Sequence, residues 1–179
     1  MLNKLFPNDI YSFYFNSLNF HLKDCQTVLD VACGRSSPLA NCEKNFTSTG
    51  LDIFEPYLKE SMAKGIHDDY IVSDVLSIDK AVKSKSFDAV IALDLIEHLE
   101  KEKGFELISL LENIAIKKVI FFTPNGFLKQ EPYDDNPWQE HLSGWTVEEF
   151  KDRDYEVFGQ GGLKYLRGEM AKIRFQPRF

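Results

Sequence analysis

Residues 27–38 have the sequence Thr-Val-Leu-Asp-Val-Ala-Cys-Gly-Arg-Ser-Ser-Pro, and the rest of the chain is organised around them. The apolar run around Asp30 is typical of a strand that is buried on both faces of a sheet. Small residues and Gly34 follow, and Ser37 and Pro38 suit the N-cap and first position of a helix. The stretch therefore predicts a strand, a tight turn and a helix start, where backbone N–H groups favour an anionic or carboxylate group. Taken alone, the turn is equally compatible with a purely structural role.

Strand-like and helix-like segments alternate along the chain, which predicts an α/β, doubly wound Rossmann-like sheet with helices on both faces. We expect one domain over residues 1–179, with six or seven strands. It consists of an N-terminal helix within 1–25, a cofactor-binding core over 27–159 that includes an acceptor-side loop at 127–145, and a weakly defined tail at 160–179. The expected strands are 27–31, 47–53, 70–73, 87–93, 118–123 and 155–159. The expected helices are 10–22, 38–44, 54–64, 101–114 and 146–153, with one or two helical turns at 77–83.

The tail leaves three alternatives open. Residues 170–175 alternate between apolar and largely basic positions, as an antiparallel edge strand with one solvated face does. Apolar residues in 164–174 also recur at helical spacing. A longer C-terminal region is the third alternative, because the tail ends without a clear final element.

The composition is that of a globular protein, with 44% hydrophobic and 13% aromatic residues. Residues 1–163 carry 16 basic and 27 acidic side chains. This negative charge disfavours general nucleic-acid binding. The sequence has neither a membrane-spanning run nor a signal-peptide hydrophobic region, so we expect a cytoplasmic protein. The cysteines lack the pairing pattern of a metal site, and we expect reduced thiols and no bound metal. They are Cys25, Cys33 and Cys42.

Four aspartates lie at or just past the ends of the first four expected strands, at intervals of 22, 22 and 20 residues. They are Asp30, Asp52, Asp74 and Asp94. In a parallel sheet this spacing brings four carboxylates to one edge, where ligands bind. Because carboxylates accept hydrogen bonds from hydroxyl and amino groups, the expected ligand presents several such donors, as a nucleoside with an amino group does.

At these residues the chain resembles the class I S-adenosylmethionine-dependent methyltransferases, over about residues 28–159. Val-Leu-Asp-Val-Ala-Cys-Gly at 28–34 is similar to the first motif of that family. Gly-Leu-Asp-Ile at 50–53 and Ser-Asp-Val at 73–75 are similar to the second and third motifs. Phe-Asp-Ala-Val at 87–90, with Asp-Leu-Ile-Glu-His-Leu at 94–99, is similar to the fourth strand and its sequel.

The resemblance implies that the cofactor is S-adenosylmethionine and the product S-adenosylhomocysteine. It implies that Asp52 holds the ribose hydroxyls and that Asp74 meets the adenine amino group. The full set of expected cofactor-binding residues is Asp30, Ala32, Gly34, Asp52, Ile53, Asp74, Val75 and Asp94. Two positions depart from the pattern, because Ala32 and Ser36 stand where the family often has glycine.

The resemblance implies methyl transfer to a small-molecule acceptor by in-line displacement. The alternative is a non-catalytic protein that keeps the methyltransferase fold for binding only. A nicotinamide-dependent dehydrogenase is a third, weaker hypothesis, because only one of its three motif glycines is present. The acceptor and the oligomeric state stay open.

On the acceptor side, His141 and His98 are the candidate catalytic bases, since histidine titrates near neutral pH. A structural role is the alternative for both. Trp138, Trp145 and Asn125 are candidate substrate-binding residues, because aromatic and amide groups suit a small organic acceptor. For the two tryptophans, packing of the loop is an equal alternative.

Overall fold

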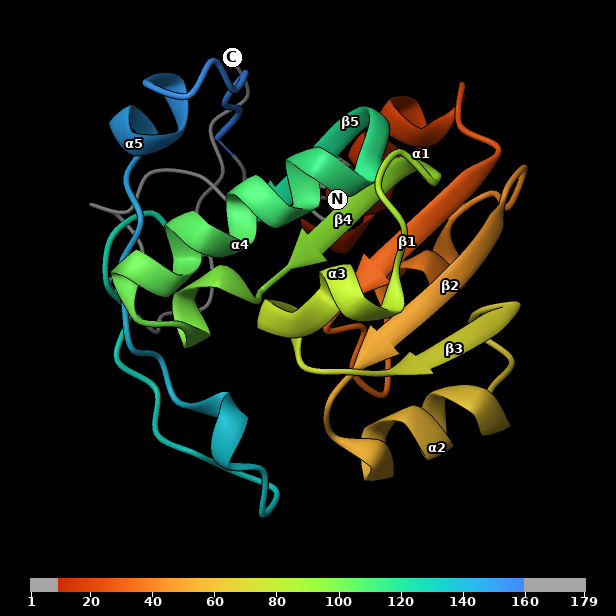
Figure 1. Ribbon diagram of the computed structural model, residues 1–179, viewed down its shortest axis with the longest axis horizontal. Helices are drawn as coiled ribbons and strands as arrows, with labels where there is room; N and C mark the ends of the chain where they lie inside the picture. Colours follow the sequence, from red (N-terminus) through yellow and green to blue (C-terminus); the bar gives the residue numbers. More distant parts are fainter. Residues whose placement is uncertain (1–9, 160–179) are drawn as a thin grey trace, which may run out of the picture.

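The structure is a computed structural model that describes residues 10–159 (Figure 1). Five strands form one parallel sheet in the order β3-β2-β1-β4-β5. Because β1 and β4 are neighbours at the centre, the chain reverses direction across the sheet between them, at the point where open α/β sheets bind ligands. The strands are β1 (Thr27–Val31), β2 (Thr47–Asp52), β3 (Asp69–Val72), β4 (Phe87–Leu93) and β5 (Ala115–Phe122).

The helices mostly follow the strands, as parallel sheets require. The α-helices are α1 (Ile10–Leu22), α2 (Glu55–Ala63), α3 (Ile78–Ala81), α4 (Lys101–Ile114) and α5 (Val147–Lys151). Short 3-10 helices are η2 (Pro38–Asn41), η3 (Val75–Ser77), η4 (Ile96–His98) and η5 (Pro137–Gln139). None of the helices within residues 10–159 has the length and apolar character that crossing a bilayer requires.

Alternate side chains of the two central strands enter two different cores. Leu29 and Val90 pack with helices α3 and α4 on one face. Val28 and Ile91 pack with α1 and η2 on the other face. All four side chains are fully buried, which explains why these strands are almost continuously apolar. A polar side chain inside such a strand, such as Asp30, must therefore find a buried partner.

The expected sixth strand is absent from the structure, and the expected seventh strand lies outside the described residues. Residues 155–159 form no strand; instead, Tyr155 packs its ring against Phe121 and Phe150 and bonds Glu112 through its hydroxyl. A local sequence pattern can indicate an extended chain, but a strand also needs a neighbouring strand with which to pair. The expected seventh strand and its helical alternative lie outside the described residues.

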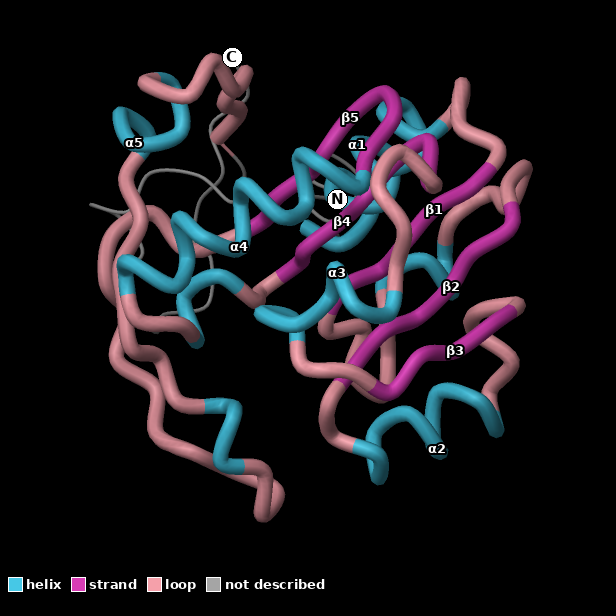
Figure 2. The backbone as a smooth tube through the Cα atoms, viewed as in Figure 1, coloured by secondary structure: helices cyan, strands magenta, loops and turns pink. Residues whose placement is uncertain are grey.

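The long connection after β5 is the main irregular segment (Figure 2). Residues 127–145, the acceptor-side loop, contain little regular structure beyond η5. The loop ends in a capping box, in which Thr146 and Glu149 satisfy each other's backbone N–H groups at the start of α5. In Figure 1 the loop is drawn in cyan and passes beyond the arrowheads of the strands.

Candidate functional site

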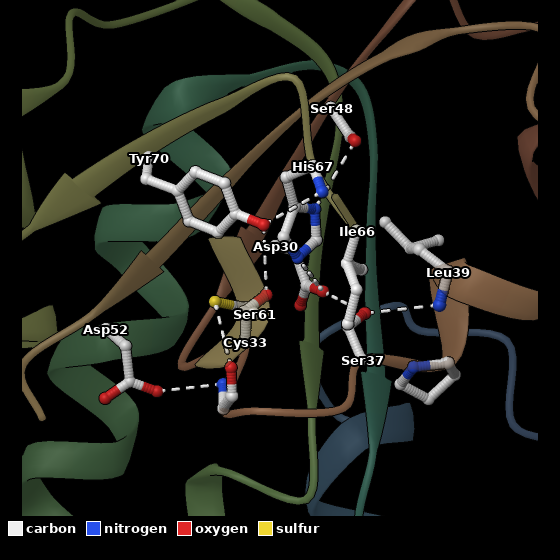
Figure 3. Close-up of polar contacts among 12 residues, drawn as sticks. Asp30, Cys33, Ser37, Leu39, Ser48, Asp52, Ser61, Ile66, His67 and Tyr70 are labelled. Atoms are coloured by element: carbon white, nitrogen blue, oxygen red, sulfur yellow. Dashed lines mark hydrogen bonds and ion pairs between the residues drawn. The ribbon is translucent and has the colours of Figure 1, made fainter. Parts of the chain in front are cut away.

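The carboxylate of Asp52 joins the turns that follow β1 and β2. Its Oδ2 accepts a hydrogen bond from the backbone N–H of Gly34 at 2.9 Å (Figure 3). Its Oδ1 accepts one from the backbone N–H of Phe54 at 2.8 Å. The side chain is largely buried, and burial raises the pKa of its carboxyl despite these bonds. A carboxylate has about four acceptor positions, so Asp52 keeps capacity for a ligand's hydroxyl groups.

The turn after β1 takes left-handed backbone conformations at two positions, Ala32 with φ of 56° and Gly34 with φ of 59°. Glycine adopts this region freely, whereas alanine does so at a cost. No heavy atom lies within 4 Å of the position that a Cβ on Gly34 would occupy. The turn therefore presents bare backbone to open space, where a ligand can approach closely.

Asp30 occupies the interior beside this turn. It is 2% exposed and accepts a short hydrogen bond from the hydroxyl of Ser37, the N-cap of η2. Its Oδ2 lies 3.6 Å from Nε2 of His67 (Figure 3). Desolvation raises the pKa of Asp30 to about 7, although the Ser37 bond opposes the shift. Through its bond with Ser37, Asp30 stabilises the turn after β1 from the protein interior.

His67 completes the buried polar cluster. Its Nδ1 lies 3.3 Å from the hydroxyl of Ser48, and burial lowers its pKa to about 4. The ring fits because β2 has a glycine beneath it: a Cβ on Gly50 would lie 2.6 Å from Cδ2 of His67 and 2.9 Å from Sγ of Cys33. The glycine therefore serves close packing, and Cys33 is a packing residue whose pKa is raised by burial.

The remaining expected cofactor residues lie at the carboxyl ends of β2, β3 and β4. Asp74 is exposed and caps η3 through a 2.9 Å bond from the backbone N–H of Leu76. Val75 is buried and Ile53 is half-buried. Asp94 is exposed and has a left-handed φ of 52°, and such strained positions concentrate at functional sites.

The acceptor-side loop is tied to the turn after β1. Arg35 forms a 2.5 Å ion pair with Asp134, which also accepts a 3.1 Å hydrogen bond from the hydroxyl of Tyr57. The guanidinium of Arg35 lies 4.9 Å from the centre of the Tyr57 ring. Further along the loop, the N–H groups of Leu142 and Ser143 both donate to the carbonyl of Glu97. The loop therefore contacts the ligand edge of the sheet at two points.

The two candidate histidines lie together at the second of these points. The rings of His98 and His141 meet edge to face, with 4.6 Å between their centres. Nδ1 of His98 is 2.9 Å from the carbonyl of Glu140, and Nδ1 of His141 is 2.6 Å from that of Leu128. Burial lowers the pKa of His98, while its contact with the Glu140 carbonyl raises it.

The three candidate substrate-binding residues differ in placement. Trp145 is 1% exposed and donates through Nε1 to the Ile96 carbonyl and the Ser143 hydroxyl. This burial favours the packing alternative. Trp138 is 55% exposed, so its ring is accessible to a ligand. Asn125 follows β5 and forms an isolated bridge with Trp145.

Four residues of this region were not among the expected site residues: Arg35, Glu97, Thr123 and Asp134. Glu97 is 2% exposed; its Oε2 accepts a 2.9 Å bond from Thr123, and burial raises its pKa to about 7. The sequence carried one signal for it, since Glu97 directly precedes His98. Nothing local distinguishes Arg35, Thr123 or Asp134, because their contacts join distant segments.

Comparison with known proteins agrees with this geometry. A family described as a methyltransferase domain matches residues 29–109. The sequence has no significant match among curated proteins.

Several solved structures are similar. A SAM-dependent methyltransferase from Archaeoglobus fulgidus has 26% identity and a TM-score of 0.62, over 81% of this chain and 66% of that one. Magnesium protoporphyrin IX methyltransferase from Synechocystis PCC 6803, solved with bound SAM, has 20% identity and a TM-score of 0.57, over 80% and 66%. The small RNA methyltransferase HEN1 has 20% identity and a TM-score of 0.60, over 82% and 21%.

The chain spans just under two thirds of the length of the archaeal enzyme. The family match includes the turn after β1, the ends of β2 and β3, and the segment from Asp94 to His98. The parallel sheet is the architecture that the sequence predicted, and Asp52, Asp74 and Asp94 lie at or just past the carboxyl ends of its strands. Residues 29–109 thus match a methyltransferase-domain family, and the fold is similar to that of a solved SAM-dependent methyltransferase.

Proposed function

We propose that this protein transfers the methyl group of S-adenosylmethionine to a small-molecule acceptor. The observation that carries the proposal is the position of Asp52. Its carboxylate is held by Gly34 and Phe54 at the ligand edge, beside a turn with open space in front of it. A buried, pre-oriented carboxylate of this kind suits the paired hydroxyls of a ribose.

The residues on this edge fit the cofactor. Asp52 would hold the ribose, Asp74 and Val75 would hold the adenine, and the Ala32–Gly34 turn would admit the amino-acid part. When bound, S-adenosylmethionine supplies a reactive methyl group on a sulfonium. The protein's contribution is then mainly to position both reactants and to exclude water.

The acceptor would lie beside the acceptor-side loop. His98 and His141 each present one ring nitrogen to a backbone carbonyl, which leaves the other nitrogen able to accept a proton or bind an electron-pair acceptor. Exposed Trp138 offers an apolar surface close by in sequence. These groups give the acceptor both orientation and a basic partner.

A small acceptor is favoured over a nucleic acid by charge. Residues 1–163 carry 27 acidic against 16 basic side chains, and such a surface repels a phosphate backbone. The similarity to HEN1, which acts on small RNA, is at 20% identity and concerns the fold. RNA therefore enters the test as a competing acceptor.

The test is methyl transfer from a donor with a labelled methyl group. Purified protein is incubated with an ultrafiltrate of cell metabolites in one arm and with total RNA in the other. The expected result is a labelled small molecule, with His141→Gln lowering transfer while S-adenosylhomocysteine still binds.

Each other outcome has a defined consequence. Label in the RNA arm alone would overturn the small-molecule acceptor. Binding of S-adenosylhomocysteine without transfer to either arm would favour the non-catalytic alternative. Failure to bind S-adenosylhomocysteine would overturn the proposed function as a whole.

A further inference from the structure

Glu97, His98 and His141 form a cluster in which one potential ligand atom from each lies within 4.8 Å of those of the other two. We propose that this cluster binds a divalent transition-metal ion at the acceptor side of the site. This inference rests on the proposed function and deepens it: the ion would hold the acceptor through an oxygen atom, and the two histidines would act as its ligands in place of a basic role. It also replaces the sequence-based expectation that the protein binds no metal.

The two histidines are arranged as metal ligands commonly are. Each ring places Nδ1 on a backbone carbonyl, that of Glu140 for His98 and that of Leu128 for His141. A carbonyl only accepts hydrogen bonds, so Nδ1 carries the proton and Nε2 keeps its lone pair. Metal-binding histidines usually have this type of support, which fixes the tautomer and the ring orientation.

A buried carboxylate oxygen of Glu97 without a partner among residues 10–159 is the second, independent observation that points to a bound ion. Its side chain is buried, with the residue 2% exposed, and its Oε1 has no hydrogen-bond partner within the described residues. The other oxygen, Oε2, is held by the hydroxyl of Thr123 at 2.9 Å. Since buried carboxylate oxygens nearly always have a partner, Oε1 is an acceptor positioned for a ligand that the protein itself does not provide.

The donor set selects the class of metal. Two imidazoles and one carboxylate suit Zn²⁺, Mn²⁺ or Fe²⁺ better than Mg²⁺ or Ca²⁺, which prefer oxygen ligands. Ligands at roughly 2.0–2.2 Å from one ion lie about 3–4 Å apart. The cluster would therefore contract by up to roughly 2 Å on binding, which side-chain rotation can supply.

Three protein ligands leave coordination positions for the acceptor, as in catalytic rather than structural metal sites. A hydroxyl bound there would become more acidic. The proposal therefore specifies oxygen methylation. The acceptor hydroxyl gives its proton to solvent and its oxygen bonds to the methyl carbon. The carbon–sulfur bond breaks with its electron pair on sulfur, which leaves S-adenosylhomocysteine.

The test is calorimetric titration of chelator-treated full-length protein with Zn²⁺, Mn²⁺ and Mg²⁺, without donor or acceptor. The expected result is one site that binds Zn²⁺ most tightly and Mg²⁺ hardly at all. Glu97→Gln and His98→Gln should each weaken Zn²⁺ binding by more than about 100-fold. Thr123→Val, which keeps the side-chain shape, should weaken it by roughly 10- to 100-fold by removing support for the ligand.

Matched controls come from a glutamate and a histidine outside the cluster. Glu100→Gln changes an exposed glutamate just past η4, and His21→Gln changes a half-buried histidine on α1. Both should bind Zn²⁺ as the wild type does. Circular dichroism checks the fold of every variant, and Thr123→Val provides the test if the Glu97 variant does not fold.

Absence of a site, or Zn²⁺ binding that the Glu97, His98 and Thr123 variants leave unchanged, would overturn the proposal. Methyl transfer is then compared with chelator and with added Mn²⁺. Transfer that needs the ion supports the acceptor-holding role, and transfer that ignores a bound ion overturns that role. Metal binding by a protein that transfers no methyl group would leave the site established and refute the proposed function alone.

Discussion

The buried pair Asp30 and His67 makes a specific prediction about how stability depends on pH. The carboxyl of Asp30 has its pKa raised from 3.8 to about 7, and the imidazole of His67 has its pKa lowered from 6.5 to about 4. At about 1.36 kcal/mol per pKa unit, the shifts correspond to about 4 kcal/mol for Asp30 and about 3 kcal/mol for His67.

The two effects have opposite signs. Between about pH 4 and pH 7 the folded protein keeps a proton on Asp30 that the unfolded chain has lost, so this group makes stability fall as pH rises. Between about pH 4 and pH 6.5 the unfolded chain protonates His67 while the folded protein does not, so this group makes stability rise. Because the folded pair holds one proton in total over this range, the wild type should show almost no net dependence from these two groups.

Single substitutions should reveal the separate contributions of Asp30 and His67 to the pH dependence of stability. Asp30→Asn leaves only His67, so its stability relative to the wild type should rise by about 1.4 kcal/mol from pH 5 to pH 6. His67→Gln leaves only Asp30, so its relative stability should fall by about the same amount. Urea unfolding followed by circular dichroism at both pH values gives the comparison. Two variants whose stability changes with pH as the wild type's does would refute this reasoning, whatever their overall loss of stability.

Other predictions concern packing and the loop. Gly104→Ala should destabilise the protein by roughly 1–3 kcal/mol, measured by urea unfolding, because the new Cβ would lie 2.3 Å from the Trp145 ring; an unchanged midpoint would contradict this. Asp134→Ala removes the ion pair with Arg35, whose side chain is 42% exposed, so global stability in urea unfolding should change little. The acceptor-side loop should nevertheless be cleaved faster in limited proteolysis, and equal cleavage would argue against its attachment there. Ala32→Gly should leave the free energy of unfolding unchanged or raise it by up to about 1 kcal/mol, because glycine adopts the left-handed conformation of residue 32 without strain. Urea unfolding measures this, and a loss of more than that amount would show that the packing of the Ala32 methyl group stabilises the protein.

Local patterns were sufficient to predict most elements of the sheet. The expected strand at 87–93 and the expected helices at 10–22 and 101–114 match β4, α1 and α4. Their apolar periodicity is set by which face is buried, and that information lies in neighbouring residues. The capping box at Thr146 and Glu149 was predicted for the same reason and is confirmed. The expected strand at 155–159 was wrong, because pairing depends on a distant partner that no local pattern reports.

The same distinction between local patterns and distant contacts applies to the residues of the site. Regular spacing predicted that Asp52, Asp74 and Asp94 would lie at or just past the ends of parallel strands, and they do. Spacing could not show that Asp30 points into the interior toward His67, because that contact depends on how η2 and the segment before β3 fold back. Nor could it bring His141 beside Glu97 and His98, which lie more than 40 positions earlier in the chain.

Calorimetric titration with S-adenosylhomocysteine tests whether this edge of the sheet binds the cofactor through Asp52. We expect one saturable site in the wild type and no comparable binding of NAD. In Asp52→Asn the ribose would lose a charged acceptor worth roughly 1.5–3 kcal/mol, so affinity should fall roughly 10- to 100-fold while Glu100→Gln binds normally. Absent binding of S-adenosylhomocysteine, or an affinity that Asp52→Asn leaves unchanged, would show that Asp52 does not hold the cofactor at this edge.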